Sequence, residues 1–395
     1  MLSTFLALRL LATGAETPPA SPPPSRAGLH ALLARTTFDP STGRYDYLDD
    51  HGQKLPLSFD PELQQPIQRL IDAYRVPLAQ LVAIDPATGR VLAAIESRDP
   101  ESAPAELKEP DLFPAASVFK IVTTSALLAQ GVDPDEEVCF HGGKHRIRSR
   151  EMGDDERRDH RCETLSEAVA HSANVAIAKL ADRNLDPACL RDWAARLLFN
   201  RPLPSDWPIE PSAAVIPDES FSFAQCAAGF GDVTLGAFHG AALASAIANG
   251  GLLAPLRVFA SDGPSNGPSD AQPAQAAVRL LPSELAADLS SMMELTVRKG
   301  TARRAFRFRG ARALDAAGKT GSIASKNPYR DYSWFVGFAP ASAPRIAVAA
   351  LVVNGPKWRI HASALAAAAL RTYLHPPAAA LRSASRVRRT IKPPT

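Results

Sequence analysis

The sequence predicts an α+β protein in which an antiparallel sheet flanked by helices is combined with a mostly helical subdomain. Strand-like segments occur in two groups, a hairpin pattern at residues 81–95 and three short apolar runs between residues 319 and 353. From residue 117 to about 250, apolar residues instead recur at the helical spacing of three and four. Because this helical stretch separates the two groups of strands, we expect one sheet that is discontinuous in the sequence.

Local signals place the individual elements around this sheet. Residues 61–74 have the apolar spacing of an amphipathic helix, and residues 81–95 form two apolar runs joined by a turn sequence, Asp85-Pro-Ala-Thr-Gly89. Residues 261–276 are typical of a solvated loop, because Pro, Gly, Ser and Asp dominate there. The C-terminal part is expected to contain a helix at 283–293, an antiparallel meander at 319–323, 333–338 and 345–353, and a covering helix at 362–373.

The composition excludes several classes of protein. With 395 residues, 46% hydrophobic and 22% charged, the chain is long and apolar enough for a globular core. A net charge of only +3 argues against general electrostatic binding of nucleic acid. No stretch approaches the roughly 18–20 uninterrupted apolar residues that cross a bilayer, which excludes a polytopic membrane protein. Only 10 of the 44 basic residues are lysines, so each lysine is a candidate for a role that arginine cannot fill.

Both termini differ from the rest of the chain. Residues 1–15 form an apolar run interrupted by Arg9, which predicts a signal or anchor segment; an incorrectly assigned start and a buried helix are the alternatives. Residues 16–28 are a proline-rich tether. Residues 380–395 form a basic tail, either solvated or in contact with anionic lipid or wall polymer. We therefore expect a periplasmic or otherwise extracytoplasmic protein that can contact membrane or wall through its termini.

The four cysteines permit at most two disulfides. Cys139 and Cys162 flank a polar loop, which admits a disulfide between them, free thiols or a zinc site. The loop also holds the histidines that zinc would need: His141, His145 and His160. Cys189 and Cys226 lie in apolar helical contexts and are expected to be inert core residues.

Ser117 and Lys120 form the only Ser-x-x-Lys pattern in the chain, at the start of an apolar helix that ends near Gly131. Residues three apart on a helix project from the same side, so the Lys120 amine is expected to lie against the Ser117 hydroxyl. That is the geometry of a serine nucleophile and its base, provided that burial keeps the lysine neutral. The alternative is a helix-capping serine and a solvated lysine.

Ser172 and Asn174 interrupt an apolar helical run that begins after a capping-box pattern, Thr164 with Glu167. A serine and an amide at a helix junction can relay a proton and hold a substrate carbonyl. Taken alone, the pair is better explained as the cap of a second helix that begins at Asn174.

Lys319, Thr320, Gly321 and Ser322 open the first of the late strands. A cation and a hydroxyl at a strand edge can hold a carboxylate, and glycine lets a substrate backbone approach. A turn before a strand explains the same residues. The similar segment 325–327 falls in an expected hairpin turn and is not a candidate.

In this order the three groups resemble the motif set of the serine active-site penicillin-recognising enzymes: Ser-x-x-Lys, Ser-x-Asn and Lys-Thr-Gly. The similarity is to the transpeptidase domain of penicillin-binding proteins and covers about residues 60–375, including DPATGRVLA, NVAIAKLA, GFGDVTLGAFHGAALASAIANGG, VRKGTARRAF, AGKTGS and DYSWFVGFAP. It implies a β-lactamase/transpeptidase-like fold with the active site between the sheet and the helical subdomain.

The resemblance also implies a role for each motif residue. Ser117 would be the acylated nucleophile and Lys120 its base. Ser172 would pass the proton to the leaving amine, and Asn174 would hold the substrate. No metal or organic cofactor takes part in this chemistry.

The third motif would hold the end of the substrate. Lys319 and Thr320 would bind the terminal carboxylate of a peptidoglycan stem peptide that ends in D-alanyl-D-alanine. The Ser322 N–H, after Gly321, would complete an oxyanion hole with that of Ser117. β-Lactams would then act as inhibitors by acylating the same serine.

Several activities remain open within and beside this family. Transfer to an amine gives cross-linking, which we favour, and transfer to water gives carboxypeptidation. Two features oppose a serine β-lactamase, since no Glu-x-x-Leu-Asn pattern occurs between residues 175 and 318, and position 174 is Asn rather than Val. A noncatalytic penicillin sensor is the third alternative. Only about sixty residues precede the matched region, so glycan polymerisation is not expected.

Overall fold

The computed structural model describes residues 28–99, 101, 111–143, 146–260, 276–307 and 313–376. Several predictions lie outside these residues: those for residues 1–15, for residues 380–395 and for His145. The same holds for the tether 16–28 and the loop 261–276, of which only the last residue of each is described. Within them, no helix combines the length and apolar character that a membrane span requires.

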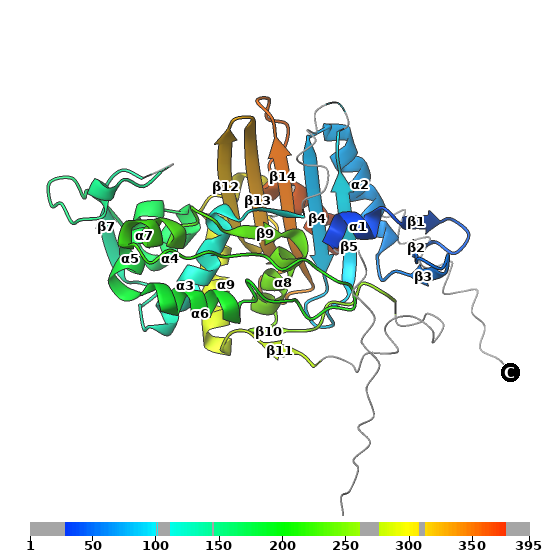
Figure 1. Ribbon diagram of the computed structural model, residues 1–395, viewed down its shortest axis with the longest axis horizontal. Helices are drawn as coiled ribbons and strands as arrows, with labels where there is room; N and C mark the ends of the chain where they lie inside the picture. The colour runs from blue at the N-terminus through cyan, green and yellow to red at the C-terminus, as the bar shows by residue number, and fades with distance from the viewer. Residues whose placement is uncertain are drawn as a thin grey trace, which may run out of the picture.

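A five-stranded antiparallel sheet forms the centre of the protein (Figure 1). Its order joins the two groups of strands predicted from the sequence, because β14 pairs with β4, for example Val348 opposite Ala83. The discontinuous sheet is therefore confirmed. The strands, in spatial order, are β12 (Ala317–Lys326), β13 (Tyr329–Ala339), β14 (Ile346–Asn354), β4 (Leu78–Ile84) and β5 (Val91–Ser97).

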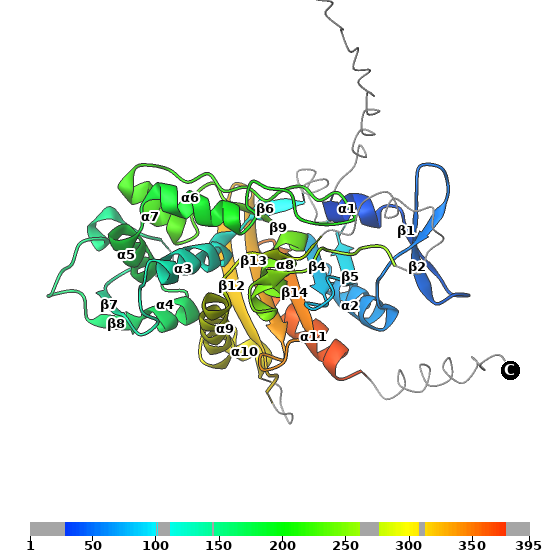
Figure 2. The ribbon, with the colours of Figure 1, turned by 90° about the horizontal axis from the view of Figure 1, so that it is seen from below.

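Both faces of the sheet are covered by helices (Figure 2). Alternation along β13 divides its side chains, so that Trp334 and Val336 join one apolar core and Phe335 joins the other. Helix α8 (Ala237–Ala248) packs on the first face, whereas α2 (Pro61–Tyr74) and α11 (Ala362–Leu374) cover the second. All-round burial explains why β14 is apolar at nearly every position.

Helix α2 has the bounds predicted from its sequence. Asp60 caps it by accepting a hydrogen bond from the Glu62 N–H, and Pro61 occupies the first helical position, where its missing N–H costs nothing. Its buried face consists of Leu63, Gln64, Ile67 and Ile71. This face anchors the second core against β5.

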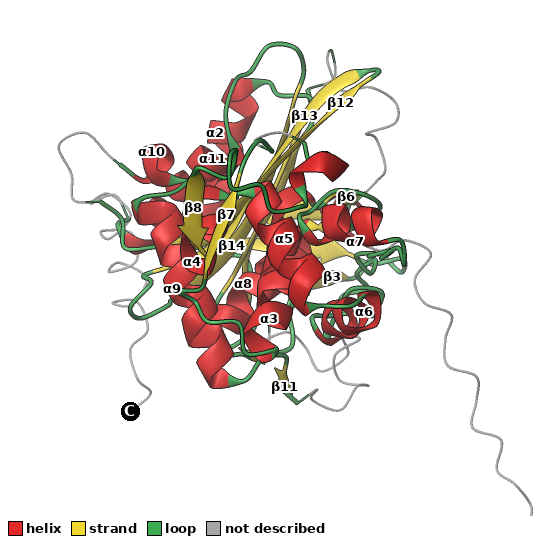
Figure 3. Ribbon diagram, turned by 90° about the vertical axis from the view of Figure 1, so that its left-hand side faces the viewer, coloured by secondary structure: helices red, strands yellow, loops and turns green. Residues whose placement is uncertain are grey.

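The helical subdomain stands beside the β12 edge of the sheet in Figure 1, and Figure 3 views the molecule from the subdomain side. It confirms the prediction that residues 117 to about 250 are mostly helical. Its elements are the 3₁₀ turn η2 (Ala116–Phe119) and helices α3 (Lys120–Ala129), α4 (Leu165–His171), α5 (Asn174–Asn184), α6 (Pro187–Arg196) and α7 (Ser220–Ala227). Helix α9 (Ser283–Arg298) contacts both α4 and β12, and the short helix α10 (Arg303–Phe306) packs against α9 and α11.

Several short elements were not expected from the sequence. They lack a clear apolar alternation; in β1, for example, two residues are partly buried and two are exposed. They are α1 (Gly28–Leu33), η3 (Ser149–Glu151), a small sheet of β1 (Thr36–Asp39), β2 (Arg44–Leu48) and β3 (Lys54–Pro56), and the pairs β6 (Leu112–Pro114) with β9 (Thr234–Gly236), β7 (Glu137–Phe140) with β8 (Arg161–Thr164), and β10 (Leu252–Leu253) with β11 (Val278–Arg279).

Cys139 and Cys162 are directly opposite each other in the β7–β8 pair and form a disulfide. The free-thiol and zinc alternatives for these two residues are therefore wrong. Lys179 of α5 holds the same hairpin, because its buried Nζ lies 2.9 Å from Asp159 Oδ2 and 3.1 Å from the Cys139 carbonyl oxygen. Of the other two cysteines, Cys226 is buried as expected, but Cys189 is partly exposed, because α6 packs only one face against the core.

Candidate active site

Ser117 lies in the η2 turn at a point where the backbone is tightly constrained. The preceding residue, Ala116, has φ 49°, a left-handed conformation that alanine adopts only at a cost in free energy. The strand leading into the turn is fixed by two hydrogen bonds, from Trp334 Nε1 to the Pro114 carbonyl at 2.9 Å and from the Ala115 N–H to the Val233 carbonyl at 2.9 Å. Ser117 is thereby held, half-buried, against the sheet.

Lys120 begins α3 and is completely buried. Its Nζ lies 2.8 Å from Ser117 Oγ, 2.7 Å from Asn174 Oδ1 and 2.6 Å from the Ala228 carbonyl oxygen. The predicted contact between lysine and serine is confirmed. Asn174, at the first position of α5, joins the same cluster.

The surroundings of Lys120 favour a neutral amine. Burial, with the charge of Lys319 as a second cause, lowers the pKa of Lys120 well below its usual range. A neutral amine has two protons and one lone pair. The two protons can be donated to Asn174 Oδ1 and the Ala228 carbonyl, which only accept, so the lone pair is left for the Ser117 hydroxyl proton.

The Ala228 carbonyl was not anticipated from the sequence. It comes from the end of α7, where Thr123 Oγ1 also donates to the Ala227 carbonyl at 2.6 Å. Gly229, with φ 92°, follows; a Cβ atom there would collide with the Ala116 carbonyl. Gly229 was the one available signal in the sequence, because a backbone acceptor leaves no residue-type signature.

The second motif lies at the junction of α4 and α5. Thr164 and Glu167 form the predicted capping box at the start of α4. Ser172 ends that helix in the left-handed conformation, with φ 57°. This sharp turn lets Ser172 and Asn174 approach different lysines from one junction.

Lys319 is also completely buried, on the face of β12 that looks toward η2. Its Nζ donates to Ser172 Oγ at 3.0 Å and to the Thr320 carbonyl at 2.8 Å. Burial lowers the pKa of Lys319 to about 7. The structure thus brings all three motifs together, as predicted.

The remaining residues of the third motif differ in their surroundings. A Cβ atom at Gly321 would lie 3.1 Å from the Ala115 carbonyl oxygen, so glycine allows β12 to approach the η2 turn closely. Ser322 is exposed. Thr320 Oγ1 lies 2.6 Å from Thr301 Oγ1, a residue that the sequence showed only as part of a longer matching segment.

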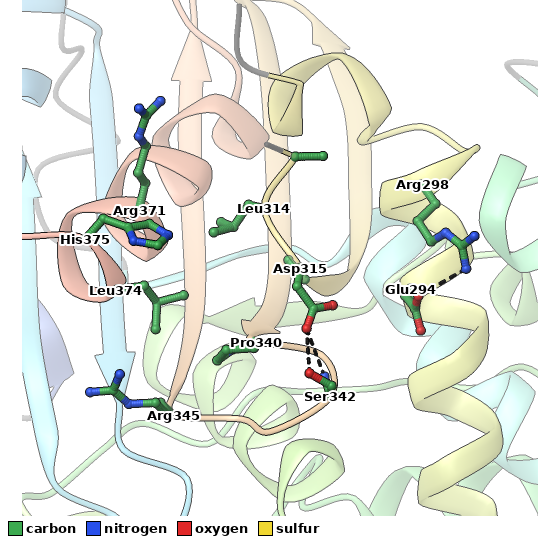
Figure 4. A pocket seen from close by; sticks show the side chains of 12 residues that line it. Glu294, Arg298, Leu314, Asp315, Pro340, Ser342, Arg345, Arg371, Leu374 and His375 are labelled. Carbon is green, nitrogen blue, oxygen red and sulfur yellow. Dashed lines mark hydrogen bonds and ion pairs between the residues drawn. The ribbon is translucent and has the colours of Figure 1, made fainter. Parts of the chain in front are cut away.

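A separate pocket of about 880 Å³ lies beside the residues that immediately precede β12 (Figure 4). It is lined by Asp315, Pro340, Ser342, Arg345 and His375, among others, and includes none of the motif residues. Asp315 accepts a 2.7 Å hydrogen bond from the Ser342 hydroxyl there. The pocket is therefore distinct from the cluster around Ser117.

Comparisons with known proteins agree with this combination of fold and motifs. The family model described as penicillin binding protein transpeptidase domain matches residues 79–373. The peptidoglycan D,D-transpeptidase PbpA of Mycobacterium tuberculosis is 27% identical, over 89% of this chain and 76% of its own length. The probable peptidoglycan D,D-transpeptidase PbpC of Pseudomonas aeruginosa is 28% identical, over 76% of this chain and 54% of its own.

Solved structures show the same architecture. The crystal structure of PBPA from Mycobacterium tuberculosis superposes with a TM-score of 0.64 at 23% identity, covering 81% of this chain and 82% of that one. The penicillin G acyl-enzyme complex of penicillin-binding protein A from M. tuberculosis gives a TM-score of 0.62 at 25% identity, covering 89% and 85%. The fold is thus the β-lactamase/transpeptidase fold. The chain belongs to the family of penicillin-binding protein transpeptidase domains.

Proposed function

We propose that this protein is a serine peptidoglycan D,D-transpeptidase that acts outside the cytoplasm and is trapped by β-lactams as an acyl-enzyme. One observation carries the proposal: the buried Lys120 amine lies 2.8 Å from Ser117 Oγ, and its other two contacts are acceptors. A neutral lysine in this position can remove the proton of the nucleophile.

In the first step, Ser117 Oγ attacks the carbonyl carbon of the D-alanyl-D-alanine bond while its proton passes to Lys120 Nζ. The N–H groups of Ser117 and Ser322 would stabilise the negative charge on the carbonyl oxygen. The C–N bond then breaks. The departing D-alanine amine takes, relayed through Ser172, the proton that Lys120 accepted, and the stem peptide remains as an ester on Ser117.

Substrate is held from the other side by the third motif. Lys319 in its cationic form and the Thr320 hydroxyl would bind the terminal carboxylate, and Asn174 would contact the peptide as well as orient Lys120. The position of β12 at the edge of the sheet is suited to an extended peptide, which can add beside it as a further strand.

The second step decides the product. Attack on the ester by an amine of a neighbouring stem peptide gives a cross-link, and attack by water gives a shortened peptide. We favour transfer to the amine, because the relatives PbpA and PbpC are named as D,D-transpeptidases. Their names also support a place in cell-wall synthesis, with stem peptides as substrates.

Labelling with a fluorescent penicillin tests the acylation step. Wild-type protein should form a covalent adduct that survives denaturation, and Ser117→Ala should form none. Ser125→Ala is a matched control in α3, because among the described residues this buried hydroxyl bonds within its own helix, to the Ile121 carbonyl. Equal labelling of wild type and Ser117→Ala would refute the nucleophile assignment.

Product analysis tests the transfer step. A stem pentapeptide is incubated with and without an excess of an amine acceptor, and the products are resolved by mass. The proposal expects the cross-linked product to exceed the hydrolysed one when acceptor is present. Rapid, repeated hydrolysis of nitrocefin would instead identify a β-lactamase.

A further inference from the structure

A threonine outside the three motifs contacts the strand that carries Lys319. Thr301 follows α9, and its Oγ1 lies 2.6 Å from Thr320 Oγ1. Thr301 is exposed and Thr320 is only partly buried, on the outermost described strand of the five-stranded sheet. The pair of hydroxyls is therefore accessible to a ligand that approaches β12.

The backbone holds Thr301 in a fixed position. Its N–H donates to the Ala170 carbonyl at 3.1 Å, and the Arg303 N–H closes the turn onto the Gly300 carbonyl at 3.2 Å. A Cβ atom at Gly300 would collide with the Ala170 carbonyl, so glycine is what lets this turn lie directly on α4. The threonine hydroxyl is thus presented by a rigid support.

Two adjacent residues of β12 are consequently bridged to the same end of α4. Lys319 reaches Ser172, two residues beyond Ala170, and Thr320 reaches Thr301, whose backbone is bonded to Ala170. The lysine and the threonine point to opposite faces of the strand. Each of the two groups that would bind the carboxylate is therefore held by a hydroxyl from outside the strand.

The substrate's carboxylate determines which of the two threonine hydroxyls must donate the proton in the Thr301–Thr320 hydrogen bond. A hydroxyl has one proton to donate and two lone pairs, whereas a carboxylate only accepts. If Thr301 donates to Thr320, the Thr320 proton remains available to the carboxylate, and the two hydrogen bonds polarise each other. If the pair is reversed, Thr320 has no proton left to offer.

We propose that Thr301 is a positioning residue for recognition of the substrate's terminal carboxylate, acting by donating its hydroxyl proton to Thr320. The inference rests on the proposed function. It assigns to the turn after α9 a part in distinguishing donors with a free carboxylate from those without one.

The test compares Thr301→Val, which keeps the shape and removes the hydroxyl, with Thr301→Ser, which keeps the hydroxyl. Two thioester donors are used, one with a leaving group that ends in a carboxylate and one with the corresponding carboxamide. Thr301→Val should lower kcat/KM for the carboxylate donor about fivefold to tenfold, as expected for loss of one hydrogen bond. It should leave the carboxamide donor within twofold, and Thr301→Ser should resemble wild type.

A double-mutant cycle makes the assignment specific. In a Thr320→Val background the Thr301→Val change should cause no further loss, because the hydroxyl that it supports is already absent. An equal loss for both donors would mean that Thr301 only supports the fold. No loss for either donor would show that its hydroxyl plays no part in recognition. Either result overturns this inference but leaves the proposed function standing. Failure of wild-type protein to be acylated by penicillin or by either donor would overturn the proposed function and the inference with it.

Discussion

The Nζ atom of Lys319 lies 3.0 Å from Ser172 Oγ, although 147 residues separate the two in the sequence. This hydrogen bond joins the edge strand of the sheet to the α4–α5 junction. Since the side chain is fully buried, and burial lowers the pKa of Lys319 to about 7, its charge changes close to neutral pH. The cation that is proposed to bind carboxylate is therefore present below pH 7 and lost above it.

This titration predicts a decline in activity on the alkaline side. For a donor that ends in a carboxylate, kcat/KM, which reports the free enzyme, should fall above pH 7, because neutral Lys319 no longer attracts the substrate. Burial and the charge of Lys319 lower the pKa of Lys120 well below the usual lysine value, which favours its neutral, basic form. Steady-state rates at pH 5.5–9 measure the effect. A carboxamide donor is the control, and the same decline with both donors would contradict the assignment to Lys319.

Asn174→Asp should impair acylation by changing the charge state of Lys120. The Asn174 oxygen lies 2.7 Å from Lys120 Nζ, and a carboxylate at that distance stabilises the ammonium form, which is not a base. We expect acylation by penicillin to slow at least tenfold at pH 7 and to recover partly at higher pH. The rate of acylation by penicillin, measured from reactions quenched at successive times over a series of pH values, reports this change.

The Asn174→Ala variant separates the effect of the added negative charge from the effect of losing the oxygen that positions Lys120. The alanine variant removes the acceptor without adding a charge, so its acylation rate should be reduced at every pH, with no recovery specific to alkaline solution. Parallel pH profiles for the aspartate and alanine variants would rule out the electrostatic explanation.

The central sheet and its covering helices were predictable because their signals are local. Helix α2 is indicated by the apolar spacing of its residues, and β13 and β14 by nearly continuous apolar runs. The small sheet β1–β3 has no such signal. Its strands are short and half-exposed, and they are ordered by neighbours distant in the sequence, such as Trp207 packed against Tyr47.

The site was predictable to a similar extent. The Ser117–Lys120 contact follows from helical spacing, and the capping box locates the helix that ends at Ser172. The contact between Lys319 and Ser172 has no local cause, and only the resemblance to a family indicated that these residues meet. The Ala228 carbonyl has no residue-type signature, since any residue supplies a backbone oxygen, and the following Gly229 was the one available signal.

Removal of the disulfide should destabilise the protein without abolishing acylation. Cys139 and Cys162 are 23 residues apart, and opening a loop of this size costs about 3 kcal/mol of unfolding free energy. The double variant Cys139→Ala, Cys162→Ala should therefore melt several degrees below wild type. Lys179 still holds the hairpin to α5 through Asp159, so penicillin labelling well below the melting temperature should be retained.

Reductant provides the control for this prediction. It should lower the melting temperature of wild-type protein toward that of the double variant and leave the variant unchanged. The free cysteines Cys189 and Cys226 are present in both proteins and cancel in the comparison. A variant that melts with wild type in the absence of reductant would show that the bridge contributes nothing to stability.

Lys319→Met should stabilise the protein while it abolishes carboxylate recognition. An unfolded lysine keeps its proton up to a pH of about 10, whereas folded Lys319 loses it near pH 7, so folding at neutral pH expels a proton at a cost on the order of 4 kcal/mol. Methionine fills a similar volume with no charge. After loss of the Ser172 hydrogen bond, we expect a net gain of about 1–4 kcal/mol at pH 7.

The sign of this effect gives it a pH signature. Between pH 7 and pH 10 the unfolded wild-type chain binds more protons at this position than the folded one, so wild-type stability rises with pH relative to the variant. The advantage of Lys319→Met should therefore be largest at and below pH 7 and should shrink toward pH 10. Denaturant unfolding of both proteins at several pH values measures the difference. Lys120 contributes to it as well, because the variant removes the Lys319 charge that helps to lower the pKa of Lys120. A difference independent of pH would mean that Lys319 is charged in the folded protein throughout this range. The cation would then be present before any substrate carboxylate binds.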